Sequence, residues 1–460
     1  MIDTSAQAAR AIRSGVRHRG LALSERRLLL IGLDVLAVAA AFVAAFNLHT
    51  AGVRNAGFYV PRLGTLIAVG MYLVCAHMAD AYNLRAAATV PGTLRVVGTT
   101  LACSFVGLVG VFFVLPYRIT RPTLLLWLPL AAVAVLGGRL LYRRLLAADH
   151  LVTHIALVMS RKGLEDVWPE VSGHIGGLYR VAGVVDPDRA DCVERLRAMV
   201  ETRAVDEIVL GVRDDVSRDL FRGVLGCHDA GVTVRSVADL HEELTGRMLL
   251  DQLGHTWLMS LPMRGETSRV YSTFKRGVDI LASLLGLAVL AAALPLVTTL
   301  VVVDNPGRIF HRQTRVGKYG RTFTLYKLRT MREGDSALVW TEQGDRRITR
   351  AGWLLRRLHL DELPQVWSVL RGDMSLIGPR PEQPLYVEEL RRHIDFYNTR
   401  LTVRPGLTGW AQVSHGYGSG IDGTRVKLAY DLYYVKNQSV SLDLLIMART
   451  VLAVLRLGGR

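Results

Sequence analysis

Long uninterrupted apolar segments are the feature that most limits how this chain can fold. The first runs from Leu28 to about Leu48, and similar stretches follow near 63–81, 96–115 and 122–142. About 20 apolar residues suffice for a helix to cross the hydrocarbon core of a bilayer. The first stretch is too long for the apolar core of a signal peptide, so we expect it to be retained. The pattern predicts a cytosolic arm, residues 1–27, and a four-helix transmembrane bundle over residues 28–148.

Arginine is distributed unevenly around these segments. The arm, the loop with Arg85 and Arg95, and the end of the fourth segment at Arg139–Arg144 carry more arginine than the two opposite loops. Because positively charged loops stay in the cytosol, both ends of the bundle are predicted to lie inside. A net charge of +16 with 50% apolar residues indicates a protein at an anionic membrane surface. No nucleic-acid-binding motif accompanies this charge, so we expect the lipid bilayer as a partner and no nucleic acid.

The hydrophobic period changes after residue 150. Short apolar strands at 154–160, 179–186 and 206–212 alternate with helical patterns. Such a βαβ series predicts a parallel, Rossmann-like sheet in a module over residues 151–255. The turn after the first strand, Ser160–Leu164, reads SRKGL and lacks the G-x-G-x-x-G fingerprint. Without those glycines the backbone cannot approach a pyrophosphate closely, so we predict a structural or regulatory module without a dinucleotide.

A further apolar run, residues 277–303, follows the basic pair Lys275-Arg276 and is interrupted by Pro295. Its length suits a tilted fifth span. Proline removes a backbone hydrogen bond and kinks a helix, so a helix that re-enters the leaflet it came from is the alternative. A full span would place the chain before and after it on opposite sides of the membrane, whereas a re-entrant helix would not.

The segment 353–382 carries the strongest indication of chemistry. The carboxylates Asp361-Glu362 precede Leu363-Pro364 and an apolar-periodic stretch, a pattern that predicts a helix with Asp361 as its N-cap. The positive end of a helix dipole favours an ionised carboxylate and can receive a phosphate oxygen. Arg380 lies between Pro379 and Pro381, which restrict the backbone and so the direction of the guanidinium. Each feature alone is more often a solvated turn; together they indicate phosphoryl chemistry.

Five motifs support a family resemblance. In order they are FKRGVDI (274–280), NPGRIFHRQTRVGKYGRTFTLYKLRTM (305–331), LHLDELPQVWSVLRGDMSLIGPRP (358–381), RPGLTGWAQV (404–413) and YDLYYVKNQS (430–439). They closely resemble the bacterial sugar transferases known as monotopic phosphoglycosyl transferases. The longer architecture resembles the polyprenyl-phosphate hexose-1-phosphate transferase branch, which starts exopolysaccharide and O-antigen assembly.

The resemblance implies an α-rich catalytic domain over residues 269–460 on the cytosolic face of the bacterial inner membrane. It also implies that residues 275–303 form a re-entrant membrane helix, anchored by Lys275-Arg276. In the family the helix breaks about one turn closer to that pair than Pro295, near Ala292. This departure leaves the kink site open and keeps the re-entrant hairpin as the expectation.

The implied reaction moves hexose-1-phosphate from a UDP-sugar, glucose or galactose, to undecaprenyl phosphate and releases UMP. Asp361 matches the nucleophile, which would form an aspartyl-phosphosugar intermediate. Glu362 would help to hold Mg²⁺ or orient the acceptor phosphate, so Asp361 and Glu362 are the predicted magnesium ligands. The basic positions of the family motifs predict a substrate-binding shell, namely Lys327, Arg329, Arg356 and Arg380, with Arg404 nearer the nucleotide.

Several residues and classes of protein have alternative interpretations. Trp410 or Tyr434 could stack on uracil, although we expect packing roles, and His359 is expected on a helix surface. Asp34, inside the first apolar segment, is expected to pack between helices or reach the interface. A non-enzymatic membrane scaffold or sensor is the main alternative, and the intact carboxylate pair argues against it. A polytopic transferase would need more spans. A homodimer is compatible with the sequence, which fixes neither the hexose nor the oligomeric state.

Overall fold

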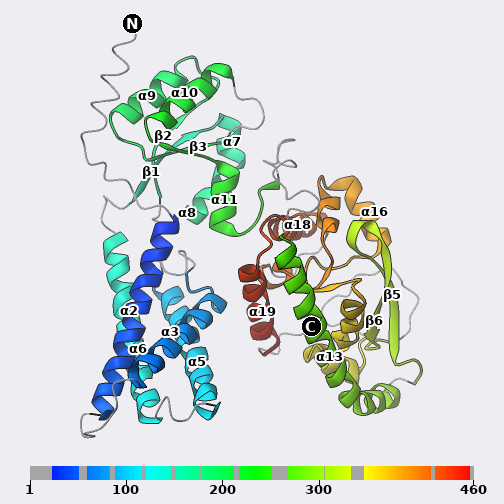
Figure 1. Cartoon of the computed structure of the whole chain (residues 1–460). Coiled ribbons are helices and arrows are strands. Elements are labelled where there is room, and N and C mark those ends of the chain that lie inside the picture. The colour runs from blue at the N-terminus through cyan, green and yellow to red at the C-terminus, as the bar shows by residue number, and fades with distance from the viewer. Residues whose placement is uncertain are drawn as a thin grey trace. The chain divides into compact units, whose positions relative to one another are not determined.

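The chain folds into two compact units, Met1–Thr245 and Gly246–Arg460. A computed structural model (Figure 1) describes residues 23–50, 60–82, 89–114, 121–146, 152–175, 179–211, 217–250, 268–304, 306–332, 347–415 and 420–455. Each unit has hydrophobic clusters of its own, so the two are described separately.

Four apolar helices pack side by side at the start of the first unit (Figure 1). Phe42, Tyr72 and Trp127 are among the buried side chains between them. A helix at each of the four expected positions is confirmed. Three are long and apolar enough to cross a membrane, whereas the apolar part of the second, Leu63–Met78, is shorter. The four helices are α2 (Leu23–Thr50), α3 (Val60–Met78), α5 (Val90–Val114) and α6 (Arg121–Leu146).

A buried ion pair joins the helices of this bundle. Arg139 of α6 lies 2.6 Å from Asp34 of α2, and each side chain is 1% exposed. Tyr72 of α3 also donates to Asp34, and Arg139 donates to the Ala81 carbonyl at 2.8 Å. Because an unpaired charge in an apolar bundle is costly, the network favours the helix-packing interpretation of Asp34.

A four-stranded parallel sheet follows the bundle, so the parallel arrangement expected from the sequence is confirmed. Its strand order is β2-β1-β3-β4, so the order of the strands in the sheet reverses between the neighbours β1 and β3, while all strands stay parallel. There the Met159 side chain packs against Gly163 and Gly211, where the chain leaves the two strands. The strands are β1 (Thr153–Val158), β2 (Tyr179–Val185), β3 (Glu207–Leu210) and β4 (Thr233–Ser236); the helices are α7 (Arg161–Asp166), α8 (Trp168–Ile175), α9 (Cys192–Glu201), α10 (Arg218–Asp229) and α11 (Val237–Thr245).

The second unit begins with a short segment and a long apolar helix. The Gly246 carbonyl accepts a hydrogen bond from the Trp410 indole at 2.6 Å, and buried Met248 donates its N–H to the Ala429 carbonyl. Helix α13 (Arg269–Asp304) contains Pro295 and changes direction in its C-terminal part (Figure 1). Segment 246–250 is therefore part of this unit's packing.

Both ends of α13 contact the globular part of the same unit. Near its start, Arg276 donates at 2.7 Å to the carbonyls of Val369 and Leu370. At its end, the carboxylate of Asp304 accepts from the Ala351 N–H at 2.7 Å. The middle of the helix presents exposed leucine and valine side chains, the surface expected of a segment in lipid.

Short strands and helices build the remainder around a core that includes Leu325, Val369 and Ile377. The motifs 358–381 and 404–413 meet where β7 pairs in parallel with β8. The close approach requires glycine at position 378, because a Cβ there would overlap the Arg404 carbonyl. The elements are β5 (Phe310–Val316), η3 (Lys318–Gly320), β6 (Thr322–Leu328), α14 (Arg350–Arg357), η4 (Leu360–Gln365), α15 (Val366–Arg371), β7 (Ser375–Ile377), α16 (Pro384–His393), η5 (Tyr397–Thr402), β8 (Gly406–Thr408), α17 (Trp410–Ser414), α18 (Gly420–Lys436) and α19 (Val440–Leu455).

Candidate functional site

The carboxylate pair lies within the 3₁₀ helix η4. Its N-cap is His359, whose backbone is left-handed with φ 55°. The prediction that Asp361 is a helix N-cap is therefore wrong, and so is the placement of His359 on a helix surface. His359 is the left-handed residue between α14 and η4. The 3₁₀ helix therefore begins at Leu360, earlier than the helix start that Pro364 predicted, and Pro364 lies inside it.

Glu362 joins two cations from different elements. Its Oε1 accepts from the Lys327 ammonium of β6 at 2.7 Å and from the Arg380 guanidinium of the loop after β7 at 2.8 Å. Burial alone would raise the pKa of Glu362, but Arg380 and Lys327 outweigh it and hold this pKa well below its usual range. The carboxylate is consequently ionised at neutral pH and holds both cations beside Asp361.

Asp361 is 8% exposed and occupies a different electrostatic environment from its neighbour. Burial and the charge of Glu362 raise its pKa, while Lys327 and Arg356 oppose that change. Burial likewise lowers the pKa of Lys327. The site therefore places one buried carboxylate next to a second one that is already neutralised by cations.

The two carboxylates fit a magnesium ion only together with substrate. Across the described ranges, no group of three or more His, Cys, Asp or Glu residues could hold a metal. Oxygen Oε1 of Glu362 is engaged by two cations, which leaves its other oxygen and the carboxylate of Asp361. Magnesium commonly takes one or two protein carboxylates, with waters and substrate phosphates completing its coordination. A phosphate-containing substrate would thus be part of such a site.

The other predicted cations have different surroundings. Arg356 donates to the Thr330 hydroxyl at 2.9 Å, and its charge opposes the rise in the pKa of Asp361. Arg329, at the end of β6, packs its guanidinium against Gly307. Arg404 is exposed on the loop before β8. The structure brings Lys327 and Arg380 together on Glu362 and leaves the roles of Arg329 and Arg404 as predictions.

The basic pair Lys275-Arg276, in the first turns of α13, anchors this helix within the unit. Lys275 lies 2.8 Å from Asp443 of α19 and 3.0 Å from the Tyr434 hydroxyl. Burial raises the pKa of Tyr434, and its ring lies in the core. The Trp410 ring stacks on Tyr433 at 5.9 Å between centroids. Trp410 and Tyr434 thus have the packing role that we expected.

Sequence reasoning missed three buried charged residues among those that the structure describes in this unit. Asp279 of α13 accepts from the Leu376 N–H at 2.9 Å, so it ties the apolar helix to β7. Arg400 of η5 pairs with Asp431 of α18 at 2.8 Å. Asp279 and Asp431 were available as charged residues inside apolar motifs, whereas Arg400 lies outside all five motifs and gave no signal.

The fold and the site define a domain with a long apolar helix, in which Lys327 and Arg380 meet on Glu362 beside the buried carboxylate of Asp361. The family model described as bacterial sugar transferase matches residues 270–457. The UDP-N-acetylgalactosamine-undecaprenyl-phosphate N-acetylgalactosaminephosphotransferase of Aeromonas hydrophila is 41% identical over 270 residues, which cover 57% of this chain and 63% of that protein.

Two further relatives carry the name UDP-glucose:undecaprenyl-phosphate glucose-1-phosphate transferase. The Caulobacter vibrioides protein is 40% identical over 205 residues, 44% of this chain and 77% of that protein. The Escherichia coli protein is 37% identical over 188 residues, 40% of each chain. The chain belongs to the bacterial sugar transferase family, as its motifs predicted. Its match spans less than two thirds of the Aeromonas and Escherichia proteins.

Proposed function

We propose that this protein transfers a sugar-1-phosphate from a UDP-sugar to undecaprenyl phosphate and releases UMP. The observation that carries the proposal is the convergence of Lys327 and Arg380 on Glu362, directly beside the buried carboxylate of Asp361. Transfer of a phosphoryl group is catalysed by placement and by charge neutralisation, which this arrangement supplies. The product would be the first lipid-linked intermediate of an exopolysaccharide, capsule or O-antigen.

The sugar that we propose is glucose, with N-acetylgalactosamine as the second candidate. Two of the relatives described above are named for glucose, and the Aeromonas relative is named for N-acetylgalactosamine. Galactose, which the resemblance also suggested, has no support from these names. A panel of UDP-sugars therefore has to include all three.

The mechanism that we propose has two displacements at one phosphorus atom. The Asp361 carboxylate attacks the sugar-linked phosphorus, an oxygen–phosphorus bond forms, and the bond to the UMP oxygen breaks. The phosphate of undecaprenyl phosphate then attacks the same phosphorus and releases Asp361. Lys327 and Arg380 offset the negative charge of the phosphates, Arg380 through its planar fork. Asp361 and Glu362 would hold Mg²⁺, which supplies further charge neutralisation when bound.

The membrane arrangement that we propose keeps the site at the cytosolic face of the inner membrane. Arg276 and Asp304 lie near opposite ends of α13, yet both are hydrogen-bonded to the same globular unit. A helix crossing the whole bilayer would separate its ends by about 30 Å of hydrocarbon. These contacts support a re-entrant α13 bent near Pro295, which would bring lipid phosphate and UDP-sugar to one surface.

The test of this function is UMP release by the purified full-length protein. We expect release with one UDP-sugar and undecaprenyl phosphate, and a phosphosugar adduct on Asp361 when the lipid is omitted, seen by mass spectrometry. Asp361→Asn is nearly isosteric and should remove both signals while the protein stays monodisperse. Sustained turnover by this variant would exclude the covalent mechanism. No UMP release with any UDP-sugar would favour the scaffold or sensor alternative.

A further inference from the structure

The loop that presents Arg380 is held by its carbonyl oxygens. The Pro379 carbonyl accepts from the Gly406 N–H at 2.9 Å, and the Glu382 carbonyl accepts from the Val316 N–H at 2.9 Å. Pro379 and Pro381 have no N–H group, so neither can donate a backbone hydrogen bond. The direction of the loop consequently depends on which donors reach its carbonyls.

Two arginine side chains supply the donors for the carbonyls in between. Arg400 donates through Nη2 to the Arg380 carbonyl at 2.8 Å. Arg315 donates through Nη1 to the Pro381 carbonyl at 3.0 Å. A hydrogen bond from an ionised donor is stronger than one between neutral groups. All four carbonyls from residue 379 to residue 382 thus have a donor, and two of the donors are guanidinium groups.

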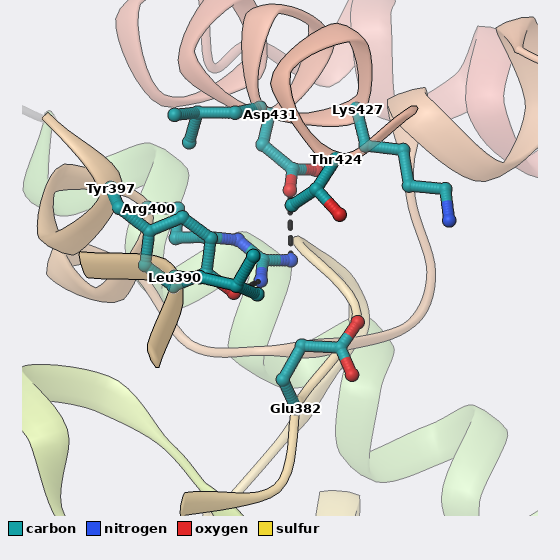
Figure 2. Close-up of a pocket in the computed structure, with 8 residues that line it drawn as sticks. Glu382, Leu390, Tyr397, Arg400, Thr424, Lys427 and Asp431 are labelled. Carbon is teal, nitrogen blue, oxygen red and sulfur yellow. Dashed lines mark hydrogen bonds and ion pairs between the residues drawn. The ribbon is translucent and has the colours of Figure 1, made fainter. Parts of the chain in front are cut away.

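Arg400 is itself buried and held by two partners. Its side chain is 7% exposed, and its guanidinium lies 2.8 Å from the carboxylate of Asp431 and donates to the Tyr397 hydroxyl at 2.9 Å. Figure 2 shows the pair among the residues that line a small pocket, with the ammonium group of Lys427 directed away from the pair. Burial alone would lower the pKa of Arg400, but Asp431 outweighs it and raises this pKa. The guanidinium therefore stays charged.

A buried ion pair is a poor means of gaining stability, because desolvation offsets most of the attraction. The pair between Arg400 and Asp431 therefore calls for a role beyond stability. Through the Arg380 carbonyl it reaches the residue whose guanidinium lies 2.8 Å from Glu362. We propose that Arg400, held by Asp431, and Arg315 are positioning residues that orient Arg380 toward the diphosphate of the donor. This inference rests on the proposed transferase function.

A double-mutant cycle on the full-length protein tests this role. We expect Arg400→Gln to lower kcat/KM for UMP release roughly 100-fold, the scale of an ångström misplacement of a catalytic group. Arg380→Lys removes the planar fork that the loop orients. If Arg400 acts through Arg380, adding Arg400→Gln to Arg380→Lys should cost less than about threefold. Full additivity would overturn the proposal, because a residue with only a structural role affects both backgrounds equally.

Two further variants keep the test decisive. Arg400→Lys retains the charge beside Asp431 and should recover part of the kcat/KM lost in Arg400→Gln, mainly through kcat. Arg315→Gln leaves the buried pair intact, so its own cycle with Arg380→Lys gives the answer if Arg400→Gln does not fold. A matched control is Arg392→Gln, because Arg392 is exposed and pairs only with Glu388 among the interactions described for it. We expect unchanged kcat/KM for this control.

The outcomes distinguish a failure of the proposed transferase function from a failure of the positioning role. A wild-type protein that releases no UMP from any UDP-sugar would overturn the proposed function and this inference with it. An active wild type with additive cycles at Arg400 and at Arg315 would overturn only the positioning role. An active wild type with a non-additive cycle, and a monodisperse elution peak for each variant, is the result that we expect.

Discussion

Asp431 predicts an uncommon dependence of stability on pH. Burial raises the pKa of Asp431 from 3.8 to about 6, although Arg400 opposes this rise. Between these two values the folded state holds a proton that the unfolded state has released, so the free energy of unfolding falls as pH increases. The difference of roughly 2 pKa units, at 1.36 kcal/mol each, corresponds to about 3 kcal/mol. Stability from this group is therefore complete below about pH 4 and is lost as pH rises through about 6.

The substitution Asp431→Asn removes this titration and leaves the other groups in place. We would measure the melting temperature of the second unit in detergent from pH 4 to pH 7, for wild type and variant. About 3 kcal/mol corresponds to a change of roughly 6–12 °C for a unit of this size. We expect the wild type to lose that much relative to the variant as pH rises. Asp422→Asn, at an exposed position of α18, is the control and should run parallel to the wild type.

The opposite result would refute this reasoning. If the wild type becomes more stable relative to Asp431→Asn as pH rises, the attraction of Arg400 exceeds the cost of burial. The pKa of Asp431 would then lie below its ordinary value. A difference that does not change with pH would mean that Asp431 has the same pKa in the folded and unfolded states.

Three other predictions concern charge, topology and the domain boundary. Glu362→Gln should slow UMP release roughly 100-fold in a steady-state assay, because Lys327 and Arg380 lose their shared partner; an unchanged rate would contradict that role. Cysteines introduced at Ser268 and at Ser336, the latter outside the described residues, should both resist an impermeant reagent in intact cells; labelling of only one would indicate a full span. Fragment 268–460 should retain transferase activity, yet melt below fragment 246–460 by the equivalent of about 3 kcal/mol. The shorter fragment lacks the Gly246 carbonyl that accepts from the Trp410 indole, and it lacks the buried side chain of Met248. Equal melting temperatures would contradict a stabilising role for segment 246–250.

The sequence by itself determined the features that depend on neighbours along the chain. The lengths of the apolar runs predicted helices α2, α3, α5 and α6, and the change of period after residue 150 predicted a parallel sheet. Hydrophobic length and periodicity are local properties, so they survive without knowledge of the fold. The ordered motifs likewise predicted membership of the bacterial sugar transferase family.

Only the tertiary structure decided which side chains meet. Glu362 receives Lys327 from a strand 35 residues earlier, and Lys275 finds Asp443 168 residues later. No pattern in the neighbouring residues predicts the left-handed backbone of His359. Because of it, Asp361 lies inside a 3₁₀ helix and not at a helix N-cap. Contacts across such separations depend on how strands and helices pack, and on the balance between burial and charge at each position. For that reason the sequence could propose a carboxylate and its cations as candidates for the chemistry, while the support of Arg380 by Arg400 and Asp431 emerged only from the folded chain.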